Sequence, residues 1–330
     1  MRTGDTLTGL IRPPKDSERY FALLKVETIN YQAPEEAKNK ILFENLTPLH
    51  PDQRMRLEQE KGENSSSEAL TARVIDLVSP IGKGQRGLLV SAPKTGKTVM
   101  LQQIAHSITA SEPDCILMVL LIDERPEEVT DFTRSVDAEV IASSNDQDLE
   151  THVRLSRLVI DRCRRLVESG KDVFVLLDSI TRVARAFNSV HGGSGRTMTG
   201  GVDARALEIP RKIFASARKT EEAGSLTIIA TALIDTGSRM DELIFQEFKG
   251  TGNMELVLDR KLAERRVYPA IDIPKSGTRK EEQLFPPQHL DAIHKLRRTM
   301  TDMNPIDAME TIKQALAKFK TNEEFLSTLK

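Results

Sequence analysis

The sequence predicts an α/β fold built on a mostly parallel sheet, and two observations support this. Short apolar runs without a two-residue alternation recur along the chain, at 87–90, 115–122, 173–177 and 226–233. Strands of this kind are typical of a sheet that is covered on both faces. Between them, residues 99–108 and 153–167 repeat apolar side chains at helical spacing. Strands and helices in alternation indicate parallel strands joined by helical crossovers.

The first zone of the chain, residues 1–45, predicts a β-hairpin. Two segments rich in β-formers, 6–12 and 19–29, are joined by a turn that contains two prolines. Two or three strands cannot close a barrel. We therefore expect this zone to be the last part of a small β-domain whose beginning is missing.

The remaining zones differ sharply in composition. Residues 46–71 are polar, lack periodicity and contain a serine run, so they predict an exposed linker. Residues 72–330 hold the alternating strands and helices. The tail of this zone, 288–330, predicts helices that are interrupted near Pro305.

Composition excludes several classes of protein. The 330 residues include 47 Lys+Arg and 49 Asp+Glu, so a diffusely basic nucleic-acid coat is excluded and any such contact must be local. Two cysteines, Cys115 and Cys163, cannot form a disulfide framework, which favours a reducing cytoplasm. No apolar run approaches the ~20 residues of a membrane span, and the first residues form no secretory signal. We expect a cytoplasmic protein without a membrane partner.

A candidate phosphate-binding loop lies between a predicted strand and a predicted helix. The segment Ser91 to Thr98 reads SAPKTGKT and matches G-x-x-x-x-G-K-[ST], except that Ser91 replaces the first glycine. Gly96 would let backbone N–H groups approach a phosphate, Lys97 would neutralise phosphate charge, and the Thr98 hydroxyl would bind Mg²⁺. The alternative is an ordinary strand-to-helix turn.

Two predicted strands end in acidic residues. Asp178 follows the run 173–177, where its carboxylate would hold the water shell of a metal ion. Glu124 follows the run 115–122, where it would orient or deprotonate an attacking water. The alternatives are a helix-capping Asp178 and a solvated acidic turn at Glu124.

Six longer motifs then carry a resemblance to a known family. They are LIDERPEEV (121–129), LDSITR (177–182), TGGVD (199–203), IDTGSRMDE (234–242), EFKGTGNM (247–254) and SGTRKEE (276–282). Together, in this order, they resemble the bacterial transcription termination factors of the Rho type. The likeness extends along the whole chain. It implies a RecA-type P-loop motor domain preceded by part of a cold-shock-like OB-fold, and a homohexameric, RNA-dependent ATPase and RNA–DNA helicase. Such a protein would bind single-stranded nascent RNA and release the transcript from the RNA polymerase elongation complex.

The resemblance also implies roles for individual residues, with ATP and Mg²⁺ as cofactors. The catalytic set would be Glu124, Lys97 and two arginines, Arg279 and Arg266, that act on a neighbouring subunit's nucleotide. Thr98 and Asp178 would hold Mg²⁺, partly through water. The residues that contact ATP would be Pro93, Lys94, Thr95, Gly96, Lys97, Thr98, Val99 and Tyr268.

RNA contacts are implied in three places. Two loops would line the pore of the ring, one containing Arg196 and one containing Thr236, Gly237, Ser238 and Arg239. The family usually carries lysine at the two arginine positions, so the charge is kept and the contact geometry changes. At the N-terminus, Glu18, Arg19 and Tyr20 match part of the primary RNA site. Since the family's N-terminal helical bundle and first barrel strands have no counterpart, we expect weakened primary RNA binding and an exposed apolar edge.

Two other functions remain to be weighed. One is a subunit of an F-type-like ATPase, which shares the RecA-type core and works without RNA. The other is a paralogue that binds RNA or nucleotide without translocating. Stimulation of ATP hydrolysis by RNA would distinguish a helicase from the F-type-like ATPase. Displacement of a strand from an RNA–DNA duplex would distinguish a helicase from the paralogue that does not translocate.

Overall fold

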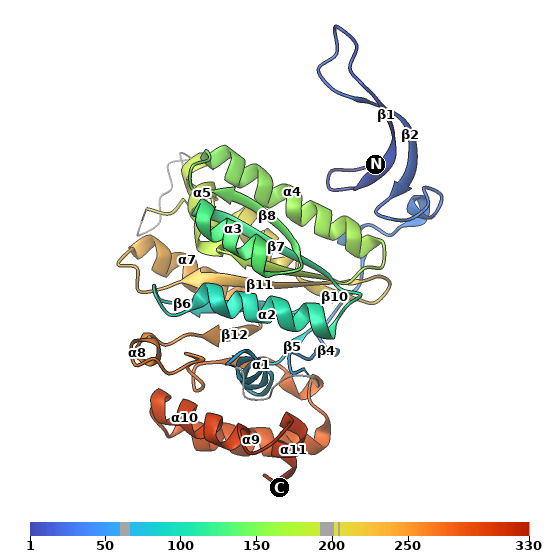
Figure 1. The fold of residues 1–330 in the computed structure, drawn as a ribbon. Helices are drawn as coiled ribbons and strands as arrows, with labels where there is room; N and C mark the ends of the chain where they lie inside the picture. Colours follow the sequence, from blue (N-terminus) through green and yellow to red (C-terminus); the bar gives the residue numbers. More distant parts are fainter. Residues whose placement is uncertain (60–66, 192–200, 204, 330) are drawn as a thin grey trace.

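A computed structural model describes residues 1–59, 67–191, 201–203 and 205–329 (Figure 1). Its centre is a sheet that, within these ranges, contains nine strands in the order β13-β12-β6-β11-β9-β7-β8, with β10 and β3 added at the side of β11. The strands from β12 to β8 run parallel, and β13, β10 and β3 are antiparallel to their neighbours. Their bounds are β3 Pro48–Leu49, β6 Arg86–Ser91, β7 Ile116–Glu124, β8 Glu139–Ser144, β9 Val173–Asp178, β10 Arg218–Thr220, β11 Ser225–Leu233, β12 Met254–Val257 and β13 Gly277–Thr278.

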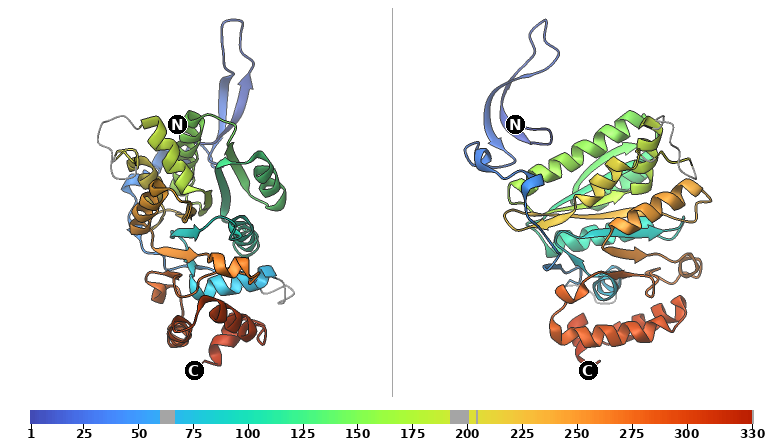
Figure 2. Two further views of the ribbon diagram at one scale, coloured as in Figure 1. Left: turned by 90° about the vertical axis from the view of Figure 1, so that its left-hand side faces the viewer. Right: turned by 180° about the vertical axis from the view of Figure 1, so that it is seen from behind.

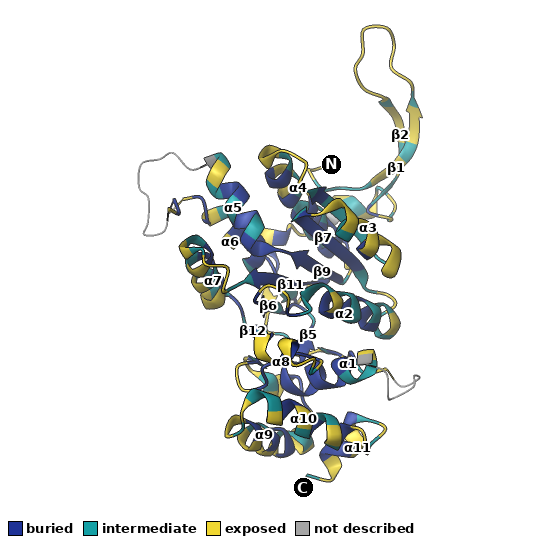
Figure 3. Cartoon of the chain, turned by 60° about the vertical axis from the view of Figure 1, so that its left-hand side comes forward, coloured by how far each residue is buried: buried dark blue, intermediate teal, exposed yellow. Residues whose placement is uncertain are grey.

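Helices cover both faces of this sheet. Alternate residues of one strand enter different cores: Leu89 packs with the α1 and α2 side, whereas Leu88 and Val90 pack with the α4 and α5 side. The bounds on the first side are α1 Ser67–Val78, α2 Lys97–Ser111, α3 Pro126–Ser135, α8 Arg260–Glu264, α9 Pro287–Thr301, α10 Pro305–Leu316 and α11 Asn322–Ser327. On the other side they are α4 Leu149–Glu168, α5 Ile180–His191, α6 Glu208–Ala215 and α7 Arg239–Thr251. Figure 3 shows the strands as the most buried layer.

The fold class predicted from the sequence is confirmed. All four apolar runs are strands of the parallel sheet, and both segments with helical spacing lie in helices. The helical tail is confirmed too, because α9 ends at Thr301 and α10 begins at Pro305. Asn304 caps α10 by accepting hydrogen bonds from the backbone N–H groups of Ile306 and Asp307. No helix of the described ranges is long and apolar enough to cross a membrane.

The N-terminal hairpin is also confirmed. Its strands, β1 Leu7–Arg12 and β2 Ala22–Ile29, pair antiparallel and project from the body of the molecule (Figures 1 and 2). Its apolar side chains are exposed, among them Ile11 at 59% and Leu24 at 63%. Two short 3-10 helices, η1 Glu36–Asn39 and η2 Phe43–Asn45, lead from the hairpin to the motor domain, and a third, η3 Glu281–Gln283, precedes α9.

The segment 46–71, predicted to be an exposed linker, contains regular structure on both sides of residues 60–66. Strand β3 joins the main sheet, β4 Arg54–Met55 pairs with β5 Ile81–Gly82, and α1 already begins at Ser67. Leu46, Met55 and Leu57 are at most 3% exposed, so burial of these side chains fixes the segment. The sequence did not indicate this burial, because the three buried apolar residues are separated by prolines and charged residues. Residues 60–66 lie outside the described ranges.

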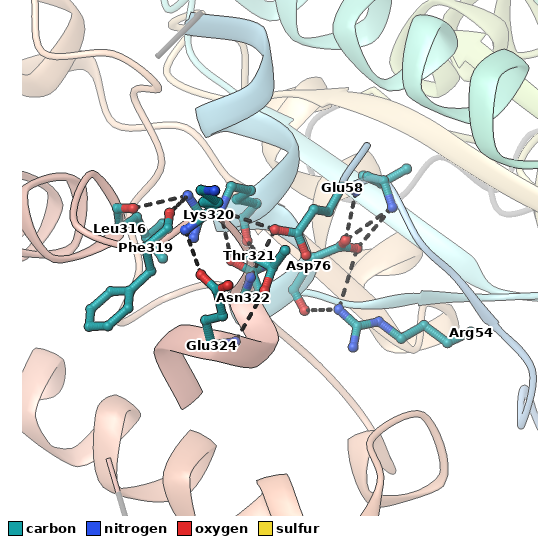
Figure 4. A network of polar contacts seen from close by, with 11 residues as sticks. Arg54, Glu58, Asp76, Leu316, Phe319, Lys320, Thr321, Asn322 and Glu324 are labelled. Atoms are coloured by element: carbon teal, nitrogen blue, oxygen red, sulfur yellow. Dashed lines mark hydrogen bonds and ion pairs between the residues drawn. The ribbon is translucent and has the colours of Figure 1, made fainter. Parts of the chain in front are cut away.

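A buried polar network anchors the same segment. Asp76 of α1 is 1% exposed and accepts hydrogen bonds from the backbone N–H groups of Leu57 and Glu58, at 3.0 and 2.9 Å. The Glu58 carboxylate accepts a hydrogen bond from the backbone N–H of Asn322, at 2.8 Å, so the segment is tied to α11 as well (Figure 4). These bonds explain how a polar stretch is held in place without a large apolar surface.

Candidate nucleotide site and nucleic-acid loops

The phosphate loop has the geometry that its sequence requires. It joins the end of β6 to the start of α2, and Gly96 at the turn has a φ of +88°, which favours glycine. Thr95 closes the turn by donating its hydroxyl to the carbonyl of Ala92 at 2.9 Å. The first N–H groups of α2 and the positive end of the helix therefore face the loop. The sequence prediction of a strand, loop and helix is confirmed.

The structure brings three predicted catalytic side chains together. The Nζ atom of Lys97 donates to Asp178 Oδ1 at 2.6 Å and to Glu124 Oε1 at 3.0 Å. Both carboxylates are at most 3% exposed. They meet because parallel strands β6, β9 and β7 end at the same edge of the sheet, with β11 between β6 and β9.

The charges and the burial of this cluster together raise the pKa values of both Lys97 and Glu124. Burial acts to lower the pKa of Lys97, but the negative charges of Asp178 and Glu124 outweigh it and raise the pKa above its ordinary value. Burial, followed by the negative charge of Asp178, raises the pKa of Glu124 despite its two cationic partners. Glu124 therefore binds a proton more readily than an ordinary glutamate does.

Two residues of this site were missed by the sequence analysis. Arg182 of α5 pairs with Glu124, at 3.1 Å between Nη1 and Oε2, and also donates to the carbonyl of Asp123. It lies in the LDSITR motif, in the first turn of the helix that begins at Ile180, so its place in that motif was an available signal. Thr231 of β11 donates its hydroxyl to Asp178 Oδ1 at 2.7 Å. A single threonine in an apolar strand gave no signal.

The donor set at this edge fits Mg²⁺. The Thr98 hydroxyl and the Asp178 carboxylate are hard oxygen donors, and Mg²⁺ is commonly bound by one or two such groups together with substrate phosphates. Among the described residues, no group of three His, Cys, Asp or Glu side chains could hold a metal ion without further ligands. Water and the phosphate oxygens of a nucleotide would complete the ligands of an ion here.

The other predicted ATP contacts lie around the loop. A Cβ atom placed on Gly96 would lie 3.8 Å from Cε1 of Tyr268, so the Tyr268 ring stands beside the loop. Pro93 and Lys94 are exposed on the loop, and Val99 is exposed in the first turn of α2. Their exposure leaves them accessible to a nucleotide.

The two predicted trans-acting arginines lie at opposite ends of the parallel strands, one at the carboxyl ends and one at the amino ends. Arg266 is exposed, two residues before Tyr268, at the edge that holds the loop. Arg279 is exposed at the other edge, where its N–H donates to the carbonyl of Asn253 at 2.8 Å. Strand β6 separates that edge from the loop by about 16 Å of extended chain. Neither arginine belongs to the cluster around Lys97.

One of the two predicted pore loops is described. Thr236 donates its hydroxyl to Asp241 at 2.5 Å, Gly237 has a φ of +76°, and Ser238 caps α7. Arg239 is exposed at the start of that helix. Asp241 is also paired with Arg185 of α5, with 2.8 Å from Nε to Oδ1. Arg196, of the other loop, lies outside the described residues.

The three residues predicted to contact RNA at the N-terminus lie in the connection between β1 and β2. Figure 1 shows this hairpin well away from β6 and α2, which flank the phosphate loop. Glu18 forms a bidentate pair with Arg12, at 2.7 and 2.8 Å, and this hydrogen bonding lowers the pKa of Glu18. Arg19 is exposed, and Tyr20 is 81% exposed. An exposed ring of this kind offers a face on which a base can stack.

Comparison with known proteins identifies the family. The profile of the ATP synthase alpha/beta family, nucleotide-binding domain, matches residues 71–278, and that of the Rho termination factor, RNA-binding domain, matches residues 1–35. Transcription termination factor Rho proteins of Buchnera aphidicola, Salmonella typhimurium and Escherichia coli are each 60% identical over all 330 residues of this chain, which cover 78% of each relative. The chain belongs to the Rho family. It is therefore an ATP-hydrolysing enzyme of transcription termination, as the sequence resemblance implied.

Solved structures agree with this at the level of the fold. An ATPase from the type III secretion system of pathogenic bacteria is 21% identical, with a TM-score of 0.71 over 96% of this chain and 93% of its own. The assembled ATPase EscN of the same system from enteropathogenic E. coli is 20% identical, with a TM-score of 0.69 over 96% and 78%. The fold alone does not decide between the Rho family and the F-type alternative. Identity along the full chain and the RNA-binding match favour the Rho family over that alternative.

Proposed function

We propose that this chain assembles into a homohexameric ring that hydrolyses ATP to move along nascent RNA, and so releases the transcript from the RNA polymerase elongation complex in the cytoplasm. Membership of the Rho family supports the overall activity. The single observation that supports the chemistry is the contact of Lys97 with both Glu124 and Asp178. These contacts bring together, at the start of a helix, the three kinds of group that P-loop phosphoryl transfer uses: a lysine for the phosphates, a carboxylate for the metal ion and a carboxylate for the attacking water.

The proposed hydrolysis follows from these contacts. A triphosphate on the loop would compete with Glu124 and Asp178 for the Lys97 ammonium. Glu124, released from Lys97 and still paired with Arg182, would orient the attacking water and accept its proton. Mg²⁺, when held by Thr98, Asp178 and the phosphates, supplies the charge that neutralises the transferring group. Tyr268 would stack on the base of the nucleotide.

The place of Arg279 supports hydrolysis at subunit interfaces. It lies at the edge of the sheet remote from its own loop, so its guanidinium is available to a neighbour's nucleotide. An arginine supplied in this way is worth ~10³–10⁵ in rate. The same role for Arg266 rests on the family resemblance, because that residue lies at the edge of its own loop.

Coupling to RNA is proposed to run along α5. This helix begins at Ile180, two residues after Asp178, and its Arg182 pairs with Glu124 while its Arg185 pairs with Asp241. Asp241 holds the loop that contains Thr236. A change in the state of Glu124 would therefore reach the RNA loop through one rigid element.

An ATPase assay tests this function. Wild-type protein is expected to hydrolyse ATP faster when single-stranded RNA is added, and Lys97→Ala is expected to lose this activity. Lys83→Ala is the matched control, because Lys83 is also ion-paired, at 2.7 Å to Asp172, and lies at the opposite end of the sheet. Retained RNA-stimulated activity in Lys97→Ala would overturn the assignment of the site. An ATPase that ignores RNA would favour the F-type alternative.

A further inference from the structure

One buried hydroxyl group at the nucleotide site has no role in the function proposed above. Thr231 is 0% exposed and interrupts the otherwise apolar stretch 228–233 of β11. A hydroxyl group that is buried without a partner costs free energy, so its partner indicates why it is there. Its closest partner is Asp178 Oδ1, at 2.7 Å, while the carbonyl of Leu177 lies at 3.5 Å. The single hydroxyl proton is therefore donated to the carboxylate.

The sheet fixes this contact from the backbone upward. β11 lies between the strand that leads into the phosphate loop and the strand that ends in Asp178. In the register, Ala230 stands opposite Leu177, which brings the next residues, Thr231 and Asp178, side by side. Threonine is branched at Cβ and has little rotational freedom within a strand. Its hydroxyl is thus held by two paired strands and does not depend on a flexible side chain.

The contact determines which oxygen of Asp178 stays available. Thr231 and Lys97 both donate to Oδ1, and among the described residues no donor is bonded to Oδ2. When a phosphate draws Lys97 away, Thr231 is the donor that still holds the carboxylate plane. Oδ2, which these donors leave unbonded, would then be free to accept from a water of the metal ion.

We propose that Thr231 is a positioning residue for Mg²⁺-nucleotide binding, acting by fixing the orientation of the Asp178 carboxylate. This rests on the function proposed above, because it requires Asp178 to face a nucleotide-bound Mg²⁺. Residues that orient a metal ligand in this way are commonly worth 10–100-fold in metal affinity or activity. Thr231 touches neither substrate nor metal, so its effect must appear through the metal dependence.

Thr231→Val removes the hydroxyl and keeps the branched shape. The measurement is equilibrium binding of a fluorescent, non-hydrolysable ATP analogue with Mg²⁺ and with EDTA. We expect the gain in affinity on adding Mg²⁺ to fall roughly 10-fold or more, with binding in EDTA unchanged within about twofold. The Mg²⁺ concentration for half-maximal ATPase activity should rise in parallel. Thr231→Ser, which keeps a hydroxyl, should restore most of the Mg²⁺ effect.

Thr227→Val is the matched control. Thr227 lies on the same strand and the same face, is 1% exposed, and accepts a hydrogen bond from the N–H of Gly84 at 2.9 Å. The control therefore loses a buried hydroxyl about 13 Å from Thr231 without touching Asp178. It should bind the analogue with a wild-type Mg²⁺ effect. If Thr231→Val does not fold, as judged by circular dichroism, Thr231→Ala replaces it.

Each outcome decides the question. A wild-type Mg²⁺ effect in the variant without the hydroxyl overturns the proposal, and so does an equal loss of affinity with Mg²⁺ and with EDTA, which would indicate a packing role. The same loss in Thr227→Val also overturns it. If the wild-type protein itself shows no Mg²⁺ effect, the proposed metal site fails, which is a different result from a failure of Thr231 alone.

Discussion

Replacing Glu124 by glutamine separates the chemistry of this site from its stability. The substitution keeps the volume of the side chain and removes its negative charge. One of its oxygens accepts from Lys97 at 3.0 Å and the other accepts from Arg182 at 3.1 Å. An amide has one oxygen, so one of these donors loses its acceptor. That loss costs about 1–3 kcal/mol.

A second contribution to the free energy of unfolding has the opposite sign, because the substitution removes a buried negative charge. The pKa of Glu124 is raised, by burial first and by Asp178 second, so its surroundings as a whole favour the uncharged form. The two contributions offset each other, and we expect the free energy of unfolding of Glu124→Gln to change by less than about 1 kcal/mol. In a chain of this size, that corresponds to a shift in Tm of about 3 °C or less.

Activity should respond very differently. Without a group that accepts a proton from water, kcat should fall by about 10²–10⁴-fold, because this is the usual contribution of general base catalysis. Nucleotide affinity should be kept or increased, since a negative charge is removed from beside the phosphates. Steady-state ATPase kinetics, analogue binding and thermal unfolding measure the three quantities on the same preparations.

The raised pKa also gives a pH dependence with a defined sign. Glu124 acts as a base only when it is ionised, so activity should be present above its pKa and lost as the pH falls through it. This loss should begin at a higher pH than an ordinary glutamate, near 4.5, would give. The contribution of Glu124 to stability has the opposite sign, because the folded state binds the proton more tightly. This reasoning would be refuted if Glu124→Gln kept the wild-type kcat. It would also be refuted if the wild-type protein lost activity only at a pH below the pKa of an ordinary glutamate.

Three further predictions follow from individual contacts. Arg279→Ala should lose its ATPase activity yet regain part of it when mixed with Lys97→Ala subunits, since each variant supplies the half-site that the other lacks; a mixture that stays inactive would contradict action between subunits. Glu168→Ala should speed hydrogen exchange in the N-terminal hairpin, because the Glu168 side chain, 6% exposed, holds the chain on both sides of it, pairing with Arg2 at 3.4 Å and accepting the N–H of Phe43 at 2.7 Å; unchanged exchange in residues 22–29 would show that these contacts do not hold the hairpin. Tyr20→Ala should weaken binding of single-stranded RNA by about 1–3 kcal/mol, measured by fluorescence anisotropy, with nucleotide affinity unchanged; equal RNA affinity would remove Tyr20 from the RNA site.

The sheet was predictable because its strands are buried on both faces. Runs such as 173–177 and 226–233 must be apolar at every position, and this pattern is visible without a partner. The strand β8, by contrast, is half-buried over most of its length, and its sequence gave no comparable run. The segment around β3 and β4 was misjudged for a related reason. Its strands are two residues long and depend on hydrogen bonds with β10 and β5, which lie far away in the sequence.

The site was predictable where function constrains a local pattern. Gly96, Lys97 and Thr98 lie together in the chain, so the loop could be read directly. Glu124 and Asp178 could be placed because parallel strands end at one edge of the sheet. Thr231 could not, since its role comes from a neighbouring strand 53 residues away in sequence. Contacts across strands depend on register, which the sequence of one strand does not determine.

The measurement that tests the central claim most directly is ATP-driven displacement of a DNA strand from an RNA–DNA duplex with a single-stranded 5′ RNA extension. The account predicts displacement by the wild-type protein that requires both ATP and the RNA extension, and none by Lys97→Ala. Hydrolysis of ATP without displacement would contradict it and would indicate a protein that binds RNA or nucleotide without translocating.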